Sequence, residues 1–523
     1  MSKRKRTVQE ELQSTGKKSP SSLHHNLLEW LQKQGTTGLS TLEFRPSKKV
    51  GGGIGTFTTQ DIQPGSSIAR LPQTCVLTAT KALRSTFGQA CSAAIVNDST
   101  GTDEFILLLW MAIGRKDSTH PFHPYLASLP QLPSLPISWS ITLTNTSTTL
   151  ENTNLGAALE SHRTLIHTTY RNLVDVVQAK CPTLIPAAYN HNDLAWAHDN
   201  YLSRRFPKRL AIEPTMVQVV REKEKKKEKQ KEKNGNTSNR ISNSISPCSN
   251  LDANQNIVAS TCSSLHGELG VMLPLFDLLN HSYETDIDWS GTALGVSFNC
   301  GIQSNGIQAG KEVFNNYGNK SNEELMMSHG FAMSNNLHDS YGLQLSVRMQ
   351  PETETETETS SSSSSTTSIS STTSTSSTTL STPTSTFLVG TFRLYRSNNP
   401  DVESGHIEQI PSELWRAVSD PMAYMQQKLE QKSETITKDA DNDDDNANIK
   451  NAIQVEWEDV NLLLQTVRAR IQPFLQTKED DLKQASATIF NENPRAQFVS
   501  MYRDGQRQIL EDIIDKLKTM IGE

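Results

Sequence analysis

The sequence of 523 residues predicts an α+β protein, in which a β-rich region carries a helical insert and is followed by an all-α C-terminal domain. Short apolar runs punctuated by Gly and Pro in residues 26–80 and 270–349 predict strands. Residues 103–206 and 387–523 instead carry apolar residues at helical spacing. Because a chain of this length exceeds one ordinary core, we expect two or more domains.

Polar segments separate these ordered blocks. The charged run REKEKKKEKQKEK predicts a disordered insertion at about 221–260, although a role in binding nucleic acid stays open for it. Residues 350–386 are almost wholly Ser and Thr and predict a disordered linker, and an acidic loop is expected at about 432–450. Residues 1–25 form a disordered basic tail, whose KRKR is either a nuclear signal or a solvated cluster.

Individual elements follow in chain order. The block that starts at residue 26 opens with a helix, NLLEWLQKQG, and continues in strand-like runs such as TLEF and CVLT. The helical insert, at about 80–206, contains an apolar helix, DEFILLLWMAIGR, and two amphipathic helices, SHRTLIHTTYRNLVDVVQAK and HNDLAWAHDNYLSRRF. The last helix begins at Pro494 after Asn493 as its cap. We expect its apolar stripe to face the core; the stripe comprises Phe498, Met501, Tyr502, Ile509, Ile513, Leu517 and Met520.

Composition excludes several classes of protein. A net charge of −7 argues against a protein that binds nucleic acid over its whole surface, and no stretch is apolar enough to span a membrane. No two of the six cysteines lie within four residues of each other, so we expect reduced thiols and no metal site. The basic N-terminus lacks the apolar core of a secretory signal. We therefore expect an intracellular protein, cytoplasmic or nuclear or both, and a monomer.

Four motifs can carry chemistry, and each also has a structural reading. GGGIGTF, at 51–57, lets backbone approach a ligand closely, although from this stretch alone a tight hairpin turn is the preferred reading. LPLFDLLNHS, at 273–282, places polar groups at the end of a buried strand, where His281 is either structural or a ligand contact. The SRRF that ends HNDLAWAHDNYLSRRF puts arginines at a helix C-terminus, where they either complement the helix dipole or bind a carboxylate.

The fourth motif is EVFNNYGNKSNEEL, at 312–325. It joins the end of a strand to a helix that Ser321 or Asn322 caps, with Glu323 and Glu324 in its first turn. Tyr317 lies at this junction, where it either fills a core edge or uses its hydroxyl in chemistry.

The order of these motifs, more than any one of them, indicates a family. Over roughly residues 40–345 the chain resembles the SET-domain protein methyltransferases, in the branch of the Rubisco large-subunit lysine methyltransferase and the actin-histidine methyltransferase. PFHPYLASLP, at 121–130, is typical of the same branch. The resemblance makes residues 26–349 a SET domain and, more weakly, residues 387–523 a helical domain similar to that branch's substrate-binding domain.

The resemblance implies S-adenosylmethionine as cofactor, and it implies a role for each matching residue. Tyr317 corresponds to the family's catalytic tyrosine. The residues that match its cofactor contacts are Gly53, Ile54, Gly55, Arg204, Asn280 and His281. The residues that match the walls of its substrate channel are Ser203, Phe206 and Phe331.

The acceptor is the least determined part of the reading. An aromatic residue at position 206 is similar to lysine-methylating relatives, whereas SNNLHD at 334–339 and His329 are closer to the histidine-methylating type. The zinc-binding cysteines that follow many histone methyltransferase domains are absent, which favours a non-histone protein substrate. The prediction is a protein-lysine N-methyltransferase. The alternatives are an actin-type histidine methyltransferase and a catalytically silent SET-fold binding module.

Overall fold

The computed structural model describes residues 20–48, 53–95, 102–131, 135–139, 150, 152–212, 269–349, 385–396, 410–421, 423–428, 457–475 and 494–523. The predicted insertion at 221–260, the acidic loop at 432–450 and most of the predicted tail and linker lie outside these residues. The chain forms two compact units. Unit 1 comprises Met1–Ser138, His162–Ser249 and Ser263–Gly318, and unit 2 comprises Trp139–Ser161, Asn250–Cys262 and Asn319–Glu523.

Small antiparallel sheets form the β-rich part of unit 1. One sheet has the order β1-β2-β8, with β1 at Leu42–Pro46, β2 at Ile54–Thr58 and β8 at Glu312–Val313. A second has the order β3-β7-β6, with β3 at Ser67–Leu71, β7 at Gly295–Cys300 and β6 at Ile287–Thr292. In a third, β4 (Arg205–Phe206) pairs with β5 (Val271–Met272). Pairing of β2 with β8 and of β3 with β7 joins residues from the two predicted β-rich blocks, at 26–80 and 270–349, whereas β4 comes from the end of the helical insert.

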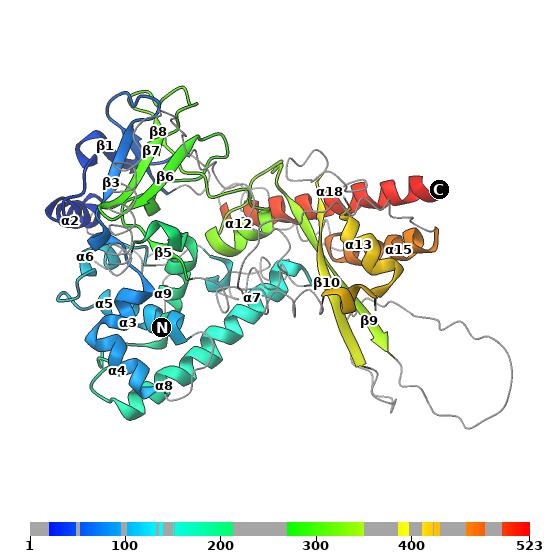
Figure 1. The fold of residues 1–523 in the computed structure, drawn as a ribbon, viewed down its shortest axis with the longest axis horizontal. Helices are drawn as coiled ribbons and strands as arrows, with labels where there is room; N and C mark the ends of the chain where they lie inside the picture. The colour runs from blue at the N-terminus through cyan, green and yellow to red at the C-terminus, as the bar shows by residue number, and fades with distance from the viewer. Residues whose placement is uncertain are drawn as a thin grey trace, which may run out of the picture. The chain divides into compact units, whose positions relative to one another are not determined.

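Helices make up most of the described residues between those blocks, as the sequence predicts for 80–206. The most buried is α5 (Thr102–Gly114), in which ten residues, including every one from Glu104 to Ala112, are buried. The last of these helices, α9 (His191–Arg204), starts with a capping box and ends at Arg204. Strand β4 follows it directly. The first helix, α2, starts at Pro20, six residues before the position expected from its apolar residues. The other helices are α3 (Ala79–Arg84), α4 (Thr86–Ala94), α6 (His123–Leu126), α7 (Asn154–Thr164), a π-helical segment (Leu165–Tyr170) and α8 (Arg171–Lys180). Figure 1 draws β1, β3, β6, β7 and β8 close together, with α3, α4, α5 and α8 below them.

Single 3₁₀ turns connect several of these elements in unit 1. The turn η8 matters most, because it lies inside the LPLFDLLNHS motif and carries Asp277. The turns are η1 (Leu39–Thr41), η2 (Gln73–Cys75), η3 (Pro136–Ser138), η6 (Lys208–Leu210) and η8 (Phe276–Leu278).

The C-terminal region was predicted to be all-α, and this prediction is wrong. Strand β10 (Ser385–Tyr395) occupies residues expected to be helical and pairs antiparallel with β9 (Ser340–Met349). Its Phe392 and Leu394 are buried while Arg393 between them is only half-buried, which is the alternation of a strand with one face on a core. The wrong prediction arose because the long polar segment that precedes β10 hides the partner strand β9 from any local pattern.

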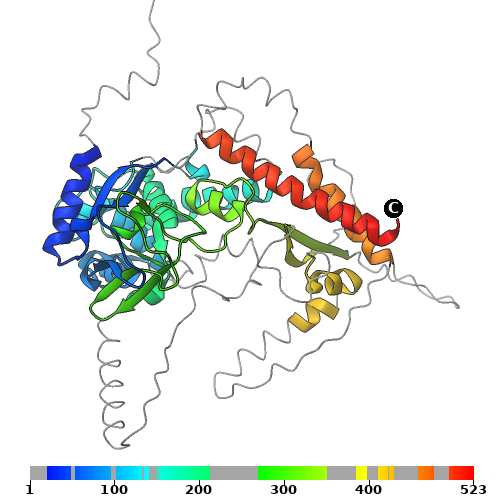
Figure 2. The same ribbon diagram turned by 90° about the horizontal axis from the view of Figure 1, so that it is seen from above.

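The described part of unit 2 also contains most of α7 and the helices α12 (Asn322–His329), α13 (Ser412–Ser419), α15 (Trp457–Leu475) and α18 (Pro494–Ile521). Helix α18 begins at Pro494, as predicted. Its predicted stripe is buried at Phe498, Tyr502, Ile509, Ile513 and Leu517, whereas Met520 is 40% exposed. Figures 1 and 2 both show α18 lying along α15, where the two helices share the core of the unit.

Candidate active site

Two of the predicted motifs cross each other in unit 1. His281 in the LPLFDLLNHS segment forms a parallel bridge with Asn315 in the EVFNNYG segment. The Asn315 backbone N–H donates to the Asn280 carbonyl at 2.8 Å, and the Ser282 N–H donates to the Asn315 carbonyl at 2.9 Å. Backbone hydrogen bonds on both sides of one residue fix the register of the crossing. The crossing therefore sets the position of Tyr317, two residues further on.

Tyr317 is held at three points. Its backbone N–H donates to Nδ1 of His281 at 3.1 Å, and its ring stacks on the imidazole with centroids 5.0 Å apart. Its hydroxyl donates to the Leu279 carbonyl at 2.7 Å. Burial raises the pKa of Tyr317 to about 12, against the opposing effect of Arg204, so the hydroxyl stays protonated near neutral pH. The Tyr317 hydroxyl is thus held in place and uncharged.

The chain turns immediately after this tyrosine. Gly318 adopts a φ of +96°, which a residue with a Cβ rarely adopts, and its N–H donates to Oδ1 of Asn316 at 2.9 Å. Asn315 supplies the crossing and Asn316 supplies the turn, so two of the asparagines around Tyr317 have structural roles.

The glycine-rich segment lies against the carboxylate of Glu312. A Cβ on Gly55 would collide with Oε1 and Cδ of Glu312, so a larger residue fits here only if the Glu312 carboxylate moves. Glu312 accepts hydrogen bonds from Nδ2 of Asn280 at 2.7 Å and from Oγ of Ser47 at 2.9 Å. Gly53 has a positive φ of +54° and open space where a Cβ would be. Glu312 thereby links the predicted cofactor residues Gly55 and Asn280, a role that the sequence analysis missed.

Arg204, at the end of α9, points to the same region. Its Nη1 donates to the backbone carbonyl of Asp277 at 2.7 Å and lies 3.3 Å from Oδ2 of that residue. Its Nε is buried and has no hydrogen-bond partner among the described residues. The Tyr317 hydroxyl donates to the Leu279 carbonyl, two residues after the Asp277 carbonyl that Arg204 contacts, so both side chains meet the same segment. A buried donor without a described partner at this segment is the arrangement expected of a ligand site.

The predicted channel residues divide between the two units. Phe206 is 7% exposed and packs against Trp289, with ring centroids 4.8 Å apart. Ser203 donates to the Asp199 carbonyl at 2.8 Å, as serines inside helices often do. Phe331 belongs to unit 2, where its ring lies edge-on to Phe498 at 6.4 Å. Its place in the channel stays a prediction.

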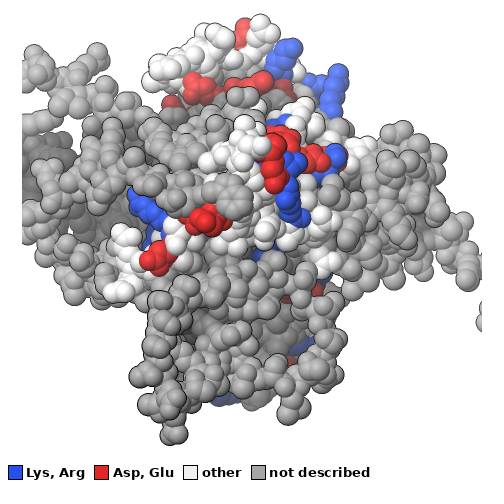
Figure 3. Space-filling view, turned by 90° about the vertical axis from the view of Figure 1, so that its right-hand side faces the viewer, with Lys and Arg blue, Asp and Glu red and all other residues white. Residues whose placement is uncertain are grey.

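The described residues include no group of three or more His, Cys, Asp and Glu that could hold a metal ion. Within the described ranges, Cys75, Cys91, Cys181 and Cys300 are free thiols, and no helix is long and apolar enough to cross a membrane. Figure 3 shows described acidic and basic side chains next to one another on one face of the molecule.

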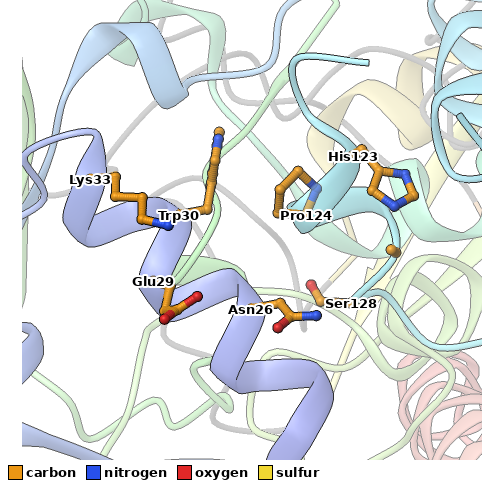
Figure 4. Close-up of a pocket in the computed structure, with 8 residues that line it drawn as sticks. Asn26, Glu29, Trp30, Lys33, His123, Pro124 and Ser128 are labelled. Carbon is orange, nitrogen blue, oxygen red and sulfur yellow. The ribbon is translucent and has the colours of Figure 1, made fainter. Parts of the chain in front are cut away.

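A pocket also lies between α2 and α6 (Figure 4). Trp30 and Lys33 line it from α2, and His123 and Pro124 line it from the α6 side. Its described lining contains none of the predicted site residues.

Comparison with solved structures identifies the fold. The SET domain of LSMT bound to lysine and AdoHcy superposes with a TM-score of 0.58 at 15% identity, over 95% of this chain and 91% of that one. Rubisco LSMT bound to AdoMet superposes with a TM-score of 0.57 at 16% identity, over 96% and 92%. The chain thus has the SET fold of Rubisco LSMT, and the resemblance predicted from the motifs is confirmed.

Particular relatives share parts of the sequence. Ribosomal lysine N-methyltransferase 1 of Saccharomyces cerevisiae is 36% identical over 80 residues, which cover 15% of this chain and 13% of that protein. Ribosomal lysine N-methyltransferase set10 of Schizosaccharomyces pombe is 35% identical over 77 residues, or 15% and 14%. Protein-lysine N-methyltransferase EFM1 of S. cerevisiae is 25% identical over 333 residues, or 62% and 52%. The matched region therefore spans about half of EFM1 and far less of the other two. No protein-family model matches the chain.

Proposed function

We propose that the protein is an S-adenosylmethionine-dependent protein-lysine N-methyltransferase that acts on a non-histone protein. The observation that carries the proposal is the crossing at Asn315, which fixes the hydroxyl of Tyr317 beside Arg204 and the Asn280–His281 segment. The likeness to three lysine methyltransferases supports the same reaction.

The residues at the site fit the cofactor that the proposal requires. Gly53 and Gly55 leave backbone uncovered by side chains, and Arg204 has a buried Nε for which no described residue is an acceptor. A carboxylate such as that of the cofactor's methionine part would satisfy that donor. Asn280 and His281, held by the crossing, are the proposed contacts of the adenosine part, and Ile54 adds a backbone contact. When bound, the cofactor supplies a sulfonium methyl group, which is transferred as the N–C bond forms and the S–C bond breaks.

The chain's own residues then have to orient the acceptor. An amine attacks along the line of the breaking bond, so its position and direction dominate the rate. We propose that the Tyr317 hydroxyl and the backbone carbonyls of Ser203 and Arg204 orient the amine. The amine must also arrive neutral, and the low-dielectric walls formed by Phe206 and Trp289 lower the pKa of a lysine that enters beside them.

The proposed acceptor is a lysine. The aromatic pair of buried Phe206 and half-buried Trp289 suits the apolar stem of a lysine, and Phe206 offers no polar atom to an imidazole. Two relatives are described as ribosomal lysine methyltransferases, so ribosomal proteins are the first substrates to test. The free thiols and the protein substrates of the relatives support an intracellular location.

The test combines methyl transfer with cofactor binding in one pair of proteins. We expect the purified chain to bind S-adenosylhomocysteine in a calorimeter and to transfer labelled methyl from S-adenosylmethionine to a protein in a ribosome-containing lysate. Tyr317→Phe removes only the hydroxyl. It should reduce turnover by roughly 10²-fold, because the amine is less well oriented, while cofactor affinity changes little.

Tyr283→Phe is the matched control, because Tyr283 also packs against His281, with ring centroids 4.3 Å apart. Its turnover should stay close to that of the unmodified chain. Absence of both cofactor binding and transfer in the unmodified chain would rule the proposal out. Loss of cofactor binding in Tyr317→Phe would instead make the tyrosine a structural residue.

A further inference from the structure

A buried triad links Arg204 to two residues that the proposed reaction does not use, Asp277 and Tyr125. The Tyr125 hydroxyl, from PFHPYLASLP, donates to Oδ2 of Asp277 at 2.8 Å. Oδ2 of Asp277 also lies 3.3 Å from Nη1 of Arg204, which donates to the Asp277 backbone carbonyl at 2.7 Å. The Asp277 side chain is fully buried, and Tyr125 is 1% exposed.

Burying a carboxylate is costly unless it is paired and hydrogen-bonded. Asp277 has one cation and one hydroxyl on the same oxygen, and its Oδ1 has no partner among the described residues. Its burial is therefore only partly compensated. A residue kept in such a position despite this cost suggests a use for its charge.

The geometry of Arg204 indicates that use. Asp277 holds one end of the guanidinium through Nη1, with its carbonyl and its carboxylate. The guanidinium is planar and rigid, so fixing one nitrogen fixes the direction of the others. Its buried Nε, without an acceptor among the described residues, is then presented in a defined direction.

We propose that Asp277 and Tyr125 are positioning residues, which hold the Arg204 guanidinium so that its Nε faces the carboxylate of the bound cofactor. This inference rests on the proposed function. It gives Tyr125 of PFHPYLASLP a role, in which its hydroxyl holds the Asp277 carboxylate that contacts Arg204.

The charge of Asp277 gives the proposal a pH signature. Burial raises the pKa of Asp277, and Arg204 and Tyr125 partly oppose the shift. The ionisable groups that face it are Arg204 from α9, Tyr125 from α6 and Tyr317 from the turn after β8. As pH falls through this raised pKa, the carboxylate is neutralised and its hold on Arg204 weakens. Cofactor affinity should therefore fall at a pH above the range in which ordinary carboxyls titrate.

The experiment measures the dissociation constant of S-adenosylhomocysteine by calorimetry from pH 5 to 9 on the full chain. Asp277→Asn keeps the shape and removes the charge. It should weaken binding about tenfold to a hundredfold at pH 8 and remove the acid-side loss of affinity. Tyr125→Phe should weaken binding about threefold to tenfold. Tyr201→Phe, which deletes another buried hydroxyl that donates to the Gly270 carbonyl at 3.2 Å, should leave binding and its pH profile unchanged.

A second measurement needs no cofactor. In the chain labelled with ¹⁵N-arginine, the Arg204 Nε–H signal is assigned by its loss in Arg204→Lys. Hindered rotation of this guanidinium should be lost in Asp277→Asn and reduced in Tyr125→Phe, but kept in Tyr201→Phe.

The two measurements separate the proposals. If the unmodified chain binds no cofactor but the Arg204 signal responds to Asp277 and Tyr125, the proposed function fails and the two residues still position Arg204. If the Arg204 signal is the same in all variants, the positioning role is overturned, whatever the affinities are.

Discussion

Glu312 shows how closely single residues are fitted around the candidate site. Its carboxylate accepts hydrogen bonds from Asn280 and Ser47, and its Oε1 occupies the space that a Cβ on Gly55 would need. The glycine and the carboxylate therefore depend on each other. This contact and the room for a ligand to approach the backbone together explain Gly55. From this stretch of sequence alone, a hairpin turn was the preferred explanation.

The substitution Gly55→Ala tests this fit. The new methyl group must displace Glu312, which carries Asn280 with it, so we expect cofactor affinity to fall by roughly tenfold or more. Glu312→Asp shortens the side chain and should itself weaken binding by a few fold. The double variant should lose less binding free energy than the two single variants lose together, because the shorter carboxylate leaves room for the methyl group.

Calorimetric titration of the four proteins with S-adenosylhomocysteine measures this coupling. Strictly additive losses would show that Gly55 and Glu312 act independently, contrary to the contact. Gly35→Ala, at a glycine with open space around it but a φ of +88° that strains alanine, controls for a general loss of stability when a glycine is replaced.

The position of Tyr317 at a strand–helix junction could be predicted from the sequence, whereas the contact of Tyr125 with Asp277 could not. Tyr317 lies in a short segment in which a strand end, a glycine and a helix cap occur together. Tyr125 and Asp277 are 152 residues apart, and no local pattern encodes a hydrogen bond over that separation. The motif PFHPYLASLP was informative as a family resemblance, whereas the contact of its tyrosine needed coordinates.

At the scale of the element, helix α12 is the clearest match between sequence and structure. Ser321 caps it and forms a capping box with Glu324, as its Ser-x-x-Glu pattern predicts. The second acidic residue behaves differently. Glu323 is 3% exposed, and burial, reinforced by Glu324, raises its pKa to about 8. Only the hydroxyl of Tyr502, at 3.5 Å, is within hydrogen-bond range of it in the described part of unit 2.

The stability of the fold should therefore depend on pH through Glu323. Between about pH 4.5 and 8 the folded state keeps a proton on Glu323 that the unfolded chain releases. The free energy of unfolding consequently falls as pH rises through this window, by on the order of a few kcal/mol in the limit of two-state unfolding. Glu323→Gln, which cannot ionise, should remove this loss. It should match the unmodified chain near pH 5 and exceed its stability at pH 9.

Urea unfolding, followed by the fluorescence of tryptophans such as the buried Trp415, measures the free energy of unfolding at both pH values. Glu324→Gln is the matched control with the opposite sign. Burial raises the pKa of Glu324, but Arg393 and Lys320 outweigh burial and keep it below its ordinary value. Its replacement should destabilise the fold at neutral pH and cost little at acid pH. Equal pH slopes for the unmodified chain and Glu323→Gln would contradict the protonation assigned to Glu323.

Strand β10 shows where element prediction failed. Helix α18 could be predicted because its periodicity extends over 28 residues and its start carries a proline. Strand β10 alternates over fewer residues, and its partner β9 lies before a long polar segment. A strand is stabilised by its neighbour, so a sequence window that excludes the neighbour underestimates it.

At the scale of the whole molecule, the candidate site is assembled from segments that are far apart in the chain. Gly55, Arg204, Asn280 and Tyr317 all belong to unit 1, and they come from the two β-rich blocks and from the end of the helical insert. Only long-range pairing, of β2 with β8 and of β4 with β5, brings them together. The order of the motifs was therefore the best sequence signal for the fold, whereas the contacts between them could not be derived from composition or periodicity.

The measurement that tests the central claim most directly is tandem mass spectrometry of a protein labelled by the purified chain. The chain is incubated with isotopically labelled S-adenosylmethionine and a ribosome-containing lysate, and the modified peptides are sequenced. The account predicts labelled methyl on the ε-nitrogen of a lysine in a non-histone protein, absent when Tyr317→Phe replaces the unmodified chain. Label on a histidine, or no label in any protein, would contradict it.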